Sequence, residues 1–441
     1  MLITESIRGR LGRTGAAVIV AAVALSALGS VRPAYAADAV VFSFATVGDS
    51  RQDPKNPDPT TLLPNNTGTL LPQDKQWLQN TKAFSRILRT IQTEKPQLLF
   101  FNGDMIYGYG RPTVPSAWAT SPPTTVAAVT GSDLVFEYTQ YAYWRGMVGP
   151  LFETGTYVIP VPGNHETQCS VTTNTGASAC VAGTKTAYSE NEDAFRANMG
   201  DLVTDLVTNA RFSTVSGVTA TNATGLTQAT APAASPNNGP ITGNQAQLSY
   251  SFDVQTTPGV LHFAVVNTDP SGADATAPAD WLATDLAAAK ARGAVKFFVF
   301  GHKPAFTYNY NAGAGGTVAA GGLDVNIPLR NAFWKVIAQY GATYFSGHEH
   351  IVNISTNADP TNTYTNTPYQ VIVGSGGSPF DDKLVGTCPS CSEPVLNAPT
   401  DRYYAWALVQ VHASGAVTLT ANGFNDAFGP TQVLYSIPNL Q

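Results

Sequence analysis

The ten residues Tyr157-Val158-Ile159-Pro160-Val161-Pro162-Gly163-Asn164-His165-Glu166 contain the pattern on which the fold prediction rests. An apolar run, Tyr157–Val161, ends almost directly at a polar cluster, Gly163–Glu166. A continuous apolar run of this length indicates a strand that is buried on both faces, as in a parallel sheet. The cluster would then lie at the carboxyl end of the strand, where the ligand crevice of an open α/β sheet forms.

The same kind of run recurs along the chain and alternates with helical patterns. The other predicted strands are Val40–Val47, Gln97–Phe101, Leu261–Asn267, Val295–Phe300, Thr343–Phe345, Tyr369–Val373 and Ala407–Val411. Apolar residues at helical spacing predict three helices, with the faces Trp77/Phe84/Ile87/Leu88/Ile91, Trp281/Leu282/Leu286 and Phe333/Val336/Ile337, the last stopping at Gly341. Strands that alternate with helices predict a layered α/β fold.

The composition indicates a loop-rich, exported protein. Of the 441 residues only 12% are charged, about half of the ~25% that is usual in globular chains. The chain also has 39 Gly and 30 Pro, and its formal net charge is −6. Because no run of basic residues is present, the sequence excludes a stable nucleic-acid partner held by phosphate contacts.

Residues 1–36 have the zones of a secretory signal peptide. Arg8, Arg10 and Arg13 precede the apolar run Ala16–Leu28, and Ala34-Tyr35-Ala36 offers small residues for cleavage. The predicted mature chain is therefore 37–441, secreted or held at the cell envelope. An uncleaved N-terminal anchor is the alternative, although the run is shorter than the ~20 residues that span a bilayer. No later stretch of the sequence predicts a transmembrane segment.

The four cysteines fit an exported protein. Two local disulfides, Cys169–Cys180 and Cys388–Cys391, are the simplest pairing. The second pair also has the spacing of a redox C-x-x-C or of half a zinc site.

Three segments are predicted to be insertions at the surface, near residues 112–130, 213–245 and 309–322. The first segment is rich in Pro and Thr, the second in Thr, Ala and Asn, and the third in Gly and Ala. Flexible surface loops and walls of a substrate cleft are the two interpretations of each segment.

Five polar clusters follow predicted strands and supply metal-ligand chemistry. They are Gly48-Asp49-Ser50-Arg51, Gly103-Asp104-Met105-Ile106-Tyr107, Gly163-Asn164-His165-Glu166, Gly301-His302 and Gly347-His348-Glu349-His350. A carboxylate such as Asp104 can bridge two cations ~3.5–4 Å apart. Further ligand atoms come from the second carboxylate, the amide and the imidazoles of Asp49, Asn164, His302, His348 and His350. The sequence therefore predicts a site for two metal ions, whereas His262 and His412 lie inside strand patterns and are expected to be structural.

The ordered set GD, GD-x-x-Y, GNHE, V-x-x-H and GH-x-H resembles the calcineurin-like metallophosphoesterases. Within that superfamily it is most similar to the purple acid phosphatases, to which Tyr107 and Val299-Phe300-Gly301-His302 correspond. The resemblance implies a single-domain four-layer α/β/β/α sandwich over residues 37–441. It also implies an enzyme that hydrolyses phosphomonoesters, with a metal-bound hydroxide as the attacking group, and residues 1–36 predict that this enzyme is exported.

The resemblance further implies a role for each residue. Asp49, Asp104, Tyr107 and His350 would hold a first metal ion, ferric in purple enzymes. Asp104, Asn164, His302 and His348 would hold a second, divalent ion (Fe, Zn or Mn). Asn164 and His165 would contact the phosphate of a small ester substrate, and His165 would protonate the leaving group.

The sequence departs from the pattern of the purple enzymes at two places. Arg51 stands where they usually have glycine, and it can clamp a phosphate oxygen or pair with a nearby acid. After His302 there is no additional histidine for the substrate, and Lys303 or Tyr308 is a candidate replacement.

Three alternatives remain open at this point. If Tyr107 packs at a strand–loop junction and is not a ligand, two divalent ions are expected. A phosphodiesterase or nucleotidase would use the same ligand residues as a monoesterase. A catalytically silent binding protein of the same fold is the alternative from another functional class.

Overall fold

The computed structural model describes residues 38–51, 80–112, 120–130, 132–170, 185–307, 321–378, 380 and 403–441. By its internal contacts the chain separates into Met1–Ala37 and Asp38–Gln441, and all of the described residues belong to the second unit. The predicted signal peptide lies outside the described residues, as do Cys180, Cys388 and Cys391, so the signal and both disulfides stay predictions.

Two sheets contain most of the strands in the described part of the chain. The first has the order β15-β14-β13-β1-β2-β3, in which β1, β2 and β3 are parallel and β13 runs antiparallel to β1. Its strands are β1 Val40–Val47, β2 Leu98–Asn102, β3 Tyr157–Val161, β13 Tyr403–His412, β14 Val417–Asn425 and β15 Gln432–Ile437.

The second sheet has the order β11-β12-β10-β9-β8-β7-β6, with β8, β9, β10 and β12 parallel to one another. Its strands are β6 Ala220–Thr224, β7 Tyr250–Gln255, β8 Val260–Val265, β9 Ala294–Phe300, β10 Thr343–Ser346, β11 Val352–Thr356 and β12 Tyr369–Val373. A short pair, β4 Gln168–Ser170 with β5 Lys185–Ala187, lies apart from both sheets.

The two sheets pack face to face through aromatic side chains. Phe44 of β1 lies edge-on to Phe298 of β9, with ring centroids 5.0 Å apart. Phe100 of β2 stacks on Phe300 of β9 at 3.7 Å. All four rings are fully buried. Because they belong to different sheets, this aromatic layer holds the carboxyl ends of β1, β2 and β9 in fixed relation to one another.

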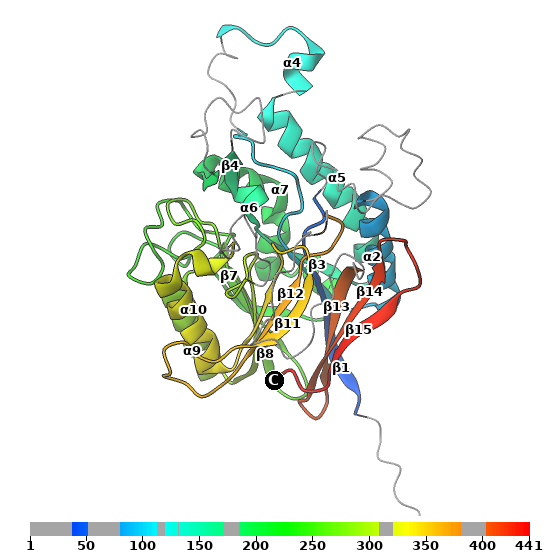
Figure 1. Cartoon of the computed structure of the whole chain (residues 1–441), viewed down its shortest axis with the longest axis vertical. Coiled ribbons are helices and arrows are strands. Elements are labelled where there is room, and N and C mark those ends of the chain that lie inside the picture. Colours follow the sequence, from blue (N-terminus) through cyan, green and yellow to red (C-terminus); the bar gives the residue numbers. More distant parts are fainter. Residues whose placement is uncertain are drawn as a thin grey trace, which may run out of the picture. The chain divides into compact units, whose positions relative to one another are not determined.

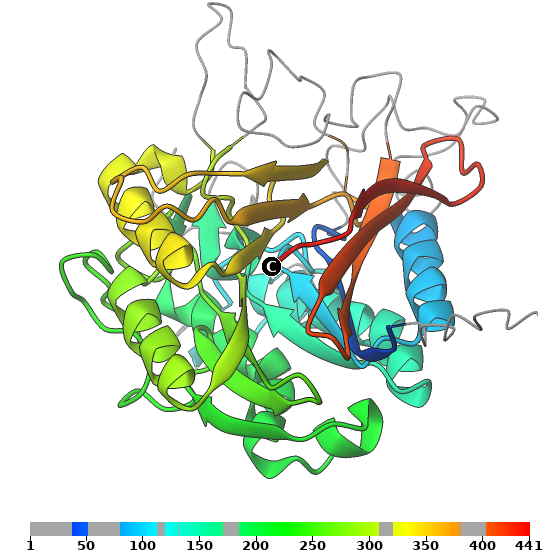
Figure 2. The same cartoon turned by 90° about the horizontal axis from the view of Figure 1, so that it is seen from below.

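Helices cover the two outer faces (Figures 1 and 2). On the first sheet, α2 (Lys82–Glu94) and α5 (Asp133–Glu153) place Phe84 and Trp144 against Phe101. On the second sheet, α9 (Ala279–Ala291) and α10 (Ile327–Tyr340) form a separate core, in which Phe333 packs on Tyr344. The predicted four-layer α/β/β/α sandwich is therefore confirmed.

The remaining helical segments are short, apart from one. They are α4 Val126–Thr130, α6 Asn164–Thr167, α7 Ser189–Thr208, α8 Phe212–Ser216 and the 3-10 turn η3 Leu323–Val325. None of the described helices is both long and apolar enough to cross a membrane.

The predicted helix end at Gly341 is confirmed, and one prediction of a loop is corrected. Gly341 ends α10 with φ +59°, a left-handed conformation that glycine adopts without a steric cost. The segment 213–245 was expected to be irregular, yet it holds most of α8 and all of β6, which adds an edge strand beside β7. Pairing with β7 supplies the order that the Thr- and Asn-rich sequence did not predict. In the other two predicted insertions, residues 113–119 and 309–320 lie outside the described residues, as does Tyr308.

Candidate metal centre

The predicted ligands come together because five parallel strands from both sheets end at the same place. Asp49 follows β1, Asp104 follows β2 and His348 follows β10, each directly after a glycine. All three residues have positive φ, at 61°, 54° and 68°. Left-handed backbone at a residue other than glycine carries strain, which native structures concentrate at functional sites.

The glycine before each ligand allows the strand ends to approach one another closely. A Cβ added at Gly347 would lie 2.2 Å from Oδ2 of Asp49, and one added at Gly103 would lie 2.6 Å from Nδ1 of His302. No side chain fits at these distances. Both positions therefore require glycine for contact, as the sequence predicted, and Gly103 with its φ of 81° requires it for conformation as well.

Four ligand atoms converge on one point, which we call the second position. Nε2 of His302 lies 2.9 Å from Oδ1 of Asn164 and 3.1 Å from Oδ1 of Asp104. Nδ1 of His348 lies 2.9 Å from the same Asn164 oxygen and 3.2 Å from Nε2 of His302. His302 and Asn164 are buried, and His348 is partly so.

The other nitrogen of each ring determines what the converging atoms can do. Nδ1 of His302 lies 2.7 Å from the carbonyl oxygen of Asn102, and Nε2 of His348 lies 2.8 Å from that of Gly321. A carbonyl only accepts, so both of these nitrogens carry the hydrogen. Nε2 of His302 and Nδ1 of His348 then direct their lone pairs toward the oxygens of Asn164 and Asp104. Four lone pairs repel one another, so this arrangement requires a positive charge among them. The second position therefore fits a divalent cation with nitrogen and oxygen ligands.

Of the residues predicted for the first position, Asp49 lies near both His350 and Asp104. Oδ1 of Asp49 is buried, has no hydrogen-bond partner among the described residues and lies 3.5 Å from Nε2 of His350. Asp49, Asp104 and His302 each place a ligand atom within 4.8 Å of the other two. A buried, unsatisfied carboxylate oxygen next to an imidazole fits a second cation at this place.

Arg51 lies among the first-position residues. Its Nε is 3.4 Å from Oδ2 of Asp104, and its Nη2 is 3.3 Å from Nε2 of His350. Of the two roles predicted for Arg51, the structure contains the ion pair with an acid. Asp104 thus turns one oxygen toward the second position and the other toward Arg51.

The electrostatics of the metal-free cluster follow from burial and from the two carboxylates. Burial opposes ionisation of Asp104, but His165, His302 and Arg51 outweigh it and hold its pKa well below the usual range. Burial raises the pKa of Asp49. For His302, burial is outweighed by Asp104 and Asp49, and its pKa is raised to about 9. A proton on His302 thus supplies the positive charge when no metal ion does.

His165 lies beside the cluster and is held in one orientation. Its Nδ1 donates a hydrogen bond to the carbonyl oxygen of Tyr107, and its Nε2 lies 3.7 Å from Oδ2 of Asp104. The ring packs on Tyr109, with centroids 3.8 Å apart. Burial, followed by the charge of Arg51, lowers the pKa of His165 well below its ordinary value. The free Nε2 is therefore the atom that can exchange a proton with a bound molecule.

A second tyrosine, which sequence reasoning missed, reaches the cluster. The hydroxyl of Tyr109 accepts a hydrogen bond from the amide of Asn164, and burial raises its pKa well above the ordinary value. The ring of Tyr107 lies 5.8 Å from that of His165, and its main-chain N–H bonds Gln140. The GD-x-x-Y spacing pointed to Tyr107 alone, and the position of Tyr109 depends on its positive φ of 63°.

Glu166 is a second residue whose role was not predicted from the sequence. Its carboxylate accepts hydrogen bonds from the main-chain N–H groups of four residues, at 2.8–3.1 Å: Gly163, Asp104, Met105 and Ile106. It therefore ties the loop that carries Asp104 to the turn that carries Asn164 and His165. In the sequence, Glu166 could be recognised only as the last residue of the GNHE motif. The structure indicates that it positions the ligand loops.

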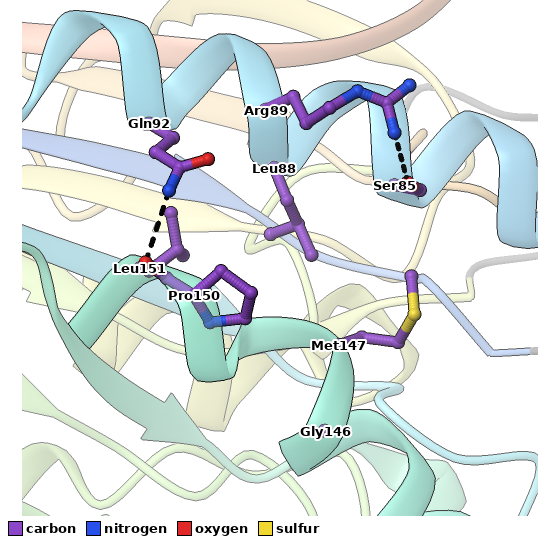
Figure 3. A pocket seen from close by; sticks show the side chains of 8 residues that line it. All are labelled: Ser85, Leu88, Arg89, Gln92, Gly146, Met147, Pro150 and Leu151. Carbon is purple, nitrogen blue, oxygen red and sulfur yellow. Dashed lines mark hydrogen bonds between the residues drawn. The ribbon is translucent and has the colours of Figure 1, made fainter. Parts of the chain in front are cut away.

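Other predicted features lie outside the cluster. Nζ of Lys303, a candidate for the substrate, pairs with Oδ1 of Asp269 at 2.5 Å. His262 is buried in β8 between Asp253 and Asp285, at 2.7 and 2.9 Å, as expected of a structural histidine. A surface cavity of about 300 Å³ between α2 and α5 is lined by residues such as Leu88 and Met147 and contains no cluster residue (Figure 3).

Comparisons with known proteins give matches by structure. No protein-family model matches the sequence, and no curated protein matches it. Among the solved structures that match this chain in fold are two phosphatases and PhoD. Purple acid phosphatase PPD1 from yellow lupin seeds has 12% identity and a TM-score of 0.49 over 90% of this chain and 53% of that one.

The other two are a dimetal phosphatase from Danio rerio and PhoD. The former has 9% identity and a TM-score of 0.42 over 90% of this chain and all of that one. The latter has 11% identity and a TM-score of 0.46 over 91% and 73%. The present chain spans about half the length of the lupin protein. Since these scores lie below 0.5, the assignment of the site rests on its geometry.

Metal binding is expected to depend on pH through His302. With a pKa of about 9, its ring is protonated at neutral pH in the metal-free protein, and an ion at Nε2 must displace that proton. Affinity should therefore rise about tenfold per pH unit up to about pH 9 and then level off. Calorimetric titration of the metal-free protein with Zn²⁺, in buffers of different ionisation enthalpy, measures both affinity and proton release. An affinity that does not change between about pH 6.5 and pH 8.5 would contradict this assignment.

Replacing Glu166 should disturb both the fold and the metal site. Glu166→Ala leaves four buried N–H groups without their acceptor, so we expect a loss of at least about 3 kcal/mol in the free energy of unfolding. Metal content after dialysis, measured by elemental analysis, should fall as well. Glu190→Ala is the matched control, because it removes a half-exposed ion pair with Arg111 and should cost at most about 1 kcal/mol. Equal stability of the two variants would argue against the positioning role.

Proposed function

We propose that this protein is a dinuclear-metal phosphoesterase that hydrolyses phosphomonoesters in the manner of the purple acid phosphatases. The observation that carries the proposal is the placement of Asp104 between two groups of ligand residues. Its Oδ1 lies with His302, His348 and Asn164, and Asp49, which lies beside His350, places a carboxylate oxygen within 4.8 Å of an Asp104 oxygen. A carboxylate shared in this way is what a pair of ions in a hydrolase requires.

Two such ions, when bound, would offset the negative charge of a phosphate group and lower the pKa of a coordinated water. The protein's own groups would orient the ester beside them. The amide of Asn164 is held by Tyr109 on one side and directed at the second position on the other. His165, anchored through Nδ1, would hold a proton at Nε2 for the departing alkoxide, because a phosphate dianion beside the ring raises its pKa.

Asp104→Ala should lose bound metal and nearly all activity, since the change removes a ligand from both positions. The measurement is turnover of p-nitrophenyl phosphate and of bis-p-nitrophenyl phosphate, each with and without a chelator. Asp193→Ala, which removes a 72% exposed carboxylate on α7, is the matched control and should retain wild-type turnover. Wild-type activity of Asp104→Ala would refute the two-metal proposal.

The two substrates separate the monoesterase from its alternatives. Chelator-sensitive preference for the monoester is the expected result. Preference for the diester would identify a phosphodiesterase or nucleotidase on the same ligand set. Turnover of neither ester by protein with both ions bound would favour a binding protein that does not catalyse.

The identity of the metals is also part of the proposal, with Fe(III) at the first position if Tyr107 is a ligand. A tyrosinate bound to Fe(III) gives a visible charge-transfer band. The band should disappear in Tyr107→Phe and persist in the matched variant Tyr109→Phe. The opposite pattern would assign the ligand to Tyr109, and a colourless protein with both ions bound would mean two divalent ions.

We further propose that the enzyme is exported, secreted or retained at the envelope, on the strength of the signal-like zones of residues 1–36. Intact mass of the protein recovered outside the cytosol should correspond to a chain that begins at Ala37. A full-length mass would indicate a retained anchor.

A further inference from the structure

Arg51 stands in the first metal position itself. Its guanidinium bridges Oδ2 of Asp104, at 3.4 Å, and Nε2 of His350, at 3.3 Å. Asp49, which is also assigned to this position, has its Oδ1 3.5 Å from the same imidazole nitrogen. The arginine is held there from the main chain as well, because its N–H donates to the carbonyl oxygen of Asp104 at 3.0 Å. Its side chain is only 16% exposed.

The second position is built differently from the first. Its ligand atoms are Oδ1 of Asp104, Oδ1 of Asn164 and one nitrogen each from His302 and His348. These atoms face one another at 2.9–3.2 Å, so a metal ion can reach them without displacing an arginine side chain. At the first position the positive charge is a covalently attached guanidinium, which can leave only by moving its side chain.

We propose that Arg51 is a built-in cation that competes with metal at the first position, so that the two positions fill in sequence. This inference rests on the proposed function, because it concerns the same pair of ions. The second position binds its ion first. The first position takes an ion only after the guanidinium has moved away from Asp104 and His350.

The physical reason is that the two cations need the same lone pairs. A metal ion must come within about 2.0–2.2 Å of the carboxylate oxygens and of the imidazole nitrogen. The guanidinium already uses two of those atoms, and like charges at this separation repel strongly where water is scarce. Once displaced, the guanidinium becomes available for a bidentate contact with a phosphate oxygen pair. The two roles that the sequence left open for Arg51 would then be two states of one side chain.

The test is the stepwise binding of Mn²⁺ to the metal-free full chain, followed by calorimetry and by elemental analysis after dialysis. In the wild type, we expect the first equivalent to bind at least about 30-fold more tightly than the second. Arg51→Met keeps the length of the stem but removes the charge. It should tighten the second equivalent at least about tenfold and change the first less than about threefold. Arg51→Lys keeps a cation and should retain the separation of the two steps.

Arg89→Met is the matched control, because Arg89 lies on the exposed side of α2 and bonds Ser85 on the same helix. It makes the same change in net charge and should leave both steps at wild-type values. Two equal steps in the wild type, or an unchanged second step in Arg51→Met, would overturn the inference. If Arg51→Met does not fold, Arg51→Gln gives the same comparison. If both ions bind with the expected separation of affinities but neither ester is hydrolysed, the proposed function is refuted and the inference stands.

Discussion

The structure depends on one electrostatic constraint, which is that the lone pairs around Asp104 need positive charge among them. The carboxylates of Asp49 and Asp104, the amide oxygen of Asn164 and three imidazoles converge where little water reaches. In the metal-free protein a proton on His302 and the guanidinium of Arg51 meet this need in part. The surrounding backbone and core hold these groups together against their mutual repulsion.

The scaffold meets that requirement with backbone geometry and with packing. Asp49, Asp104 and His348 adopt left-handed backbone at the ends of their strands, and Glu166 ties two of the ligand loops together through four main-chain hydrogen bonds. The aromatic layer around Phe44 and Phe100 holds the two sheets that deliver the ligands. Strain at the ligands is thus balanced by hydrophobic burial directly beneath them.

The sequence predicted the buried strands well, because continuous apolar runs have few other interpretations. Val40–Val47, Tyr157–Val161 and Tyr369–Val373 are strands over the same residues in the structure. The long helices α5 and α7 were not predicted. In α5, Pro150 lies inside the helix, and in α7 the buried face includes Asn191, Glu192 and Asp205. Asn191 and Glu192 have hydrogen-bond partners far away in the sequence, Gly110 and Gln245 respectively, which the local pattern does not show.

For the site, the sequence predicted which residue types gather but not how each is held. Arg51 contacts Asp104 and His350, and Tyr109 bonds Asn164. Both arrangements depend on backbone angles and on distances across the two sheets. The spacing of the motifs specifies neither the angles nor the distances.

The ligands also come from opposite halves of the chain. Asp49, Asp104 and Asn164 follow strands of the first sheet, whereas His302 and His348 follow strands of the second. A bound ion would therefore link the two sheets at the end where the ligand loops lie. Neither half carries a complete set of ligands, so the fold cannot be divided into two working modules.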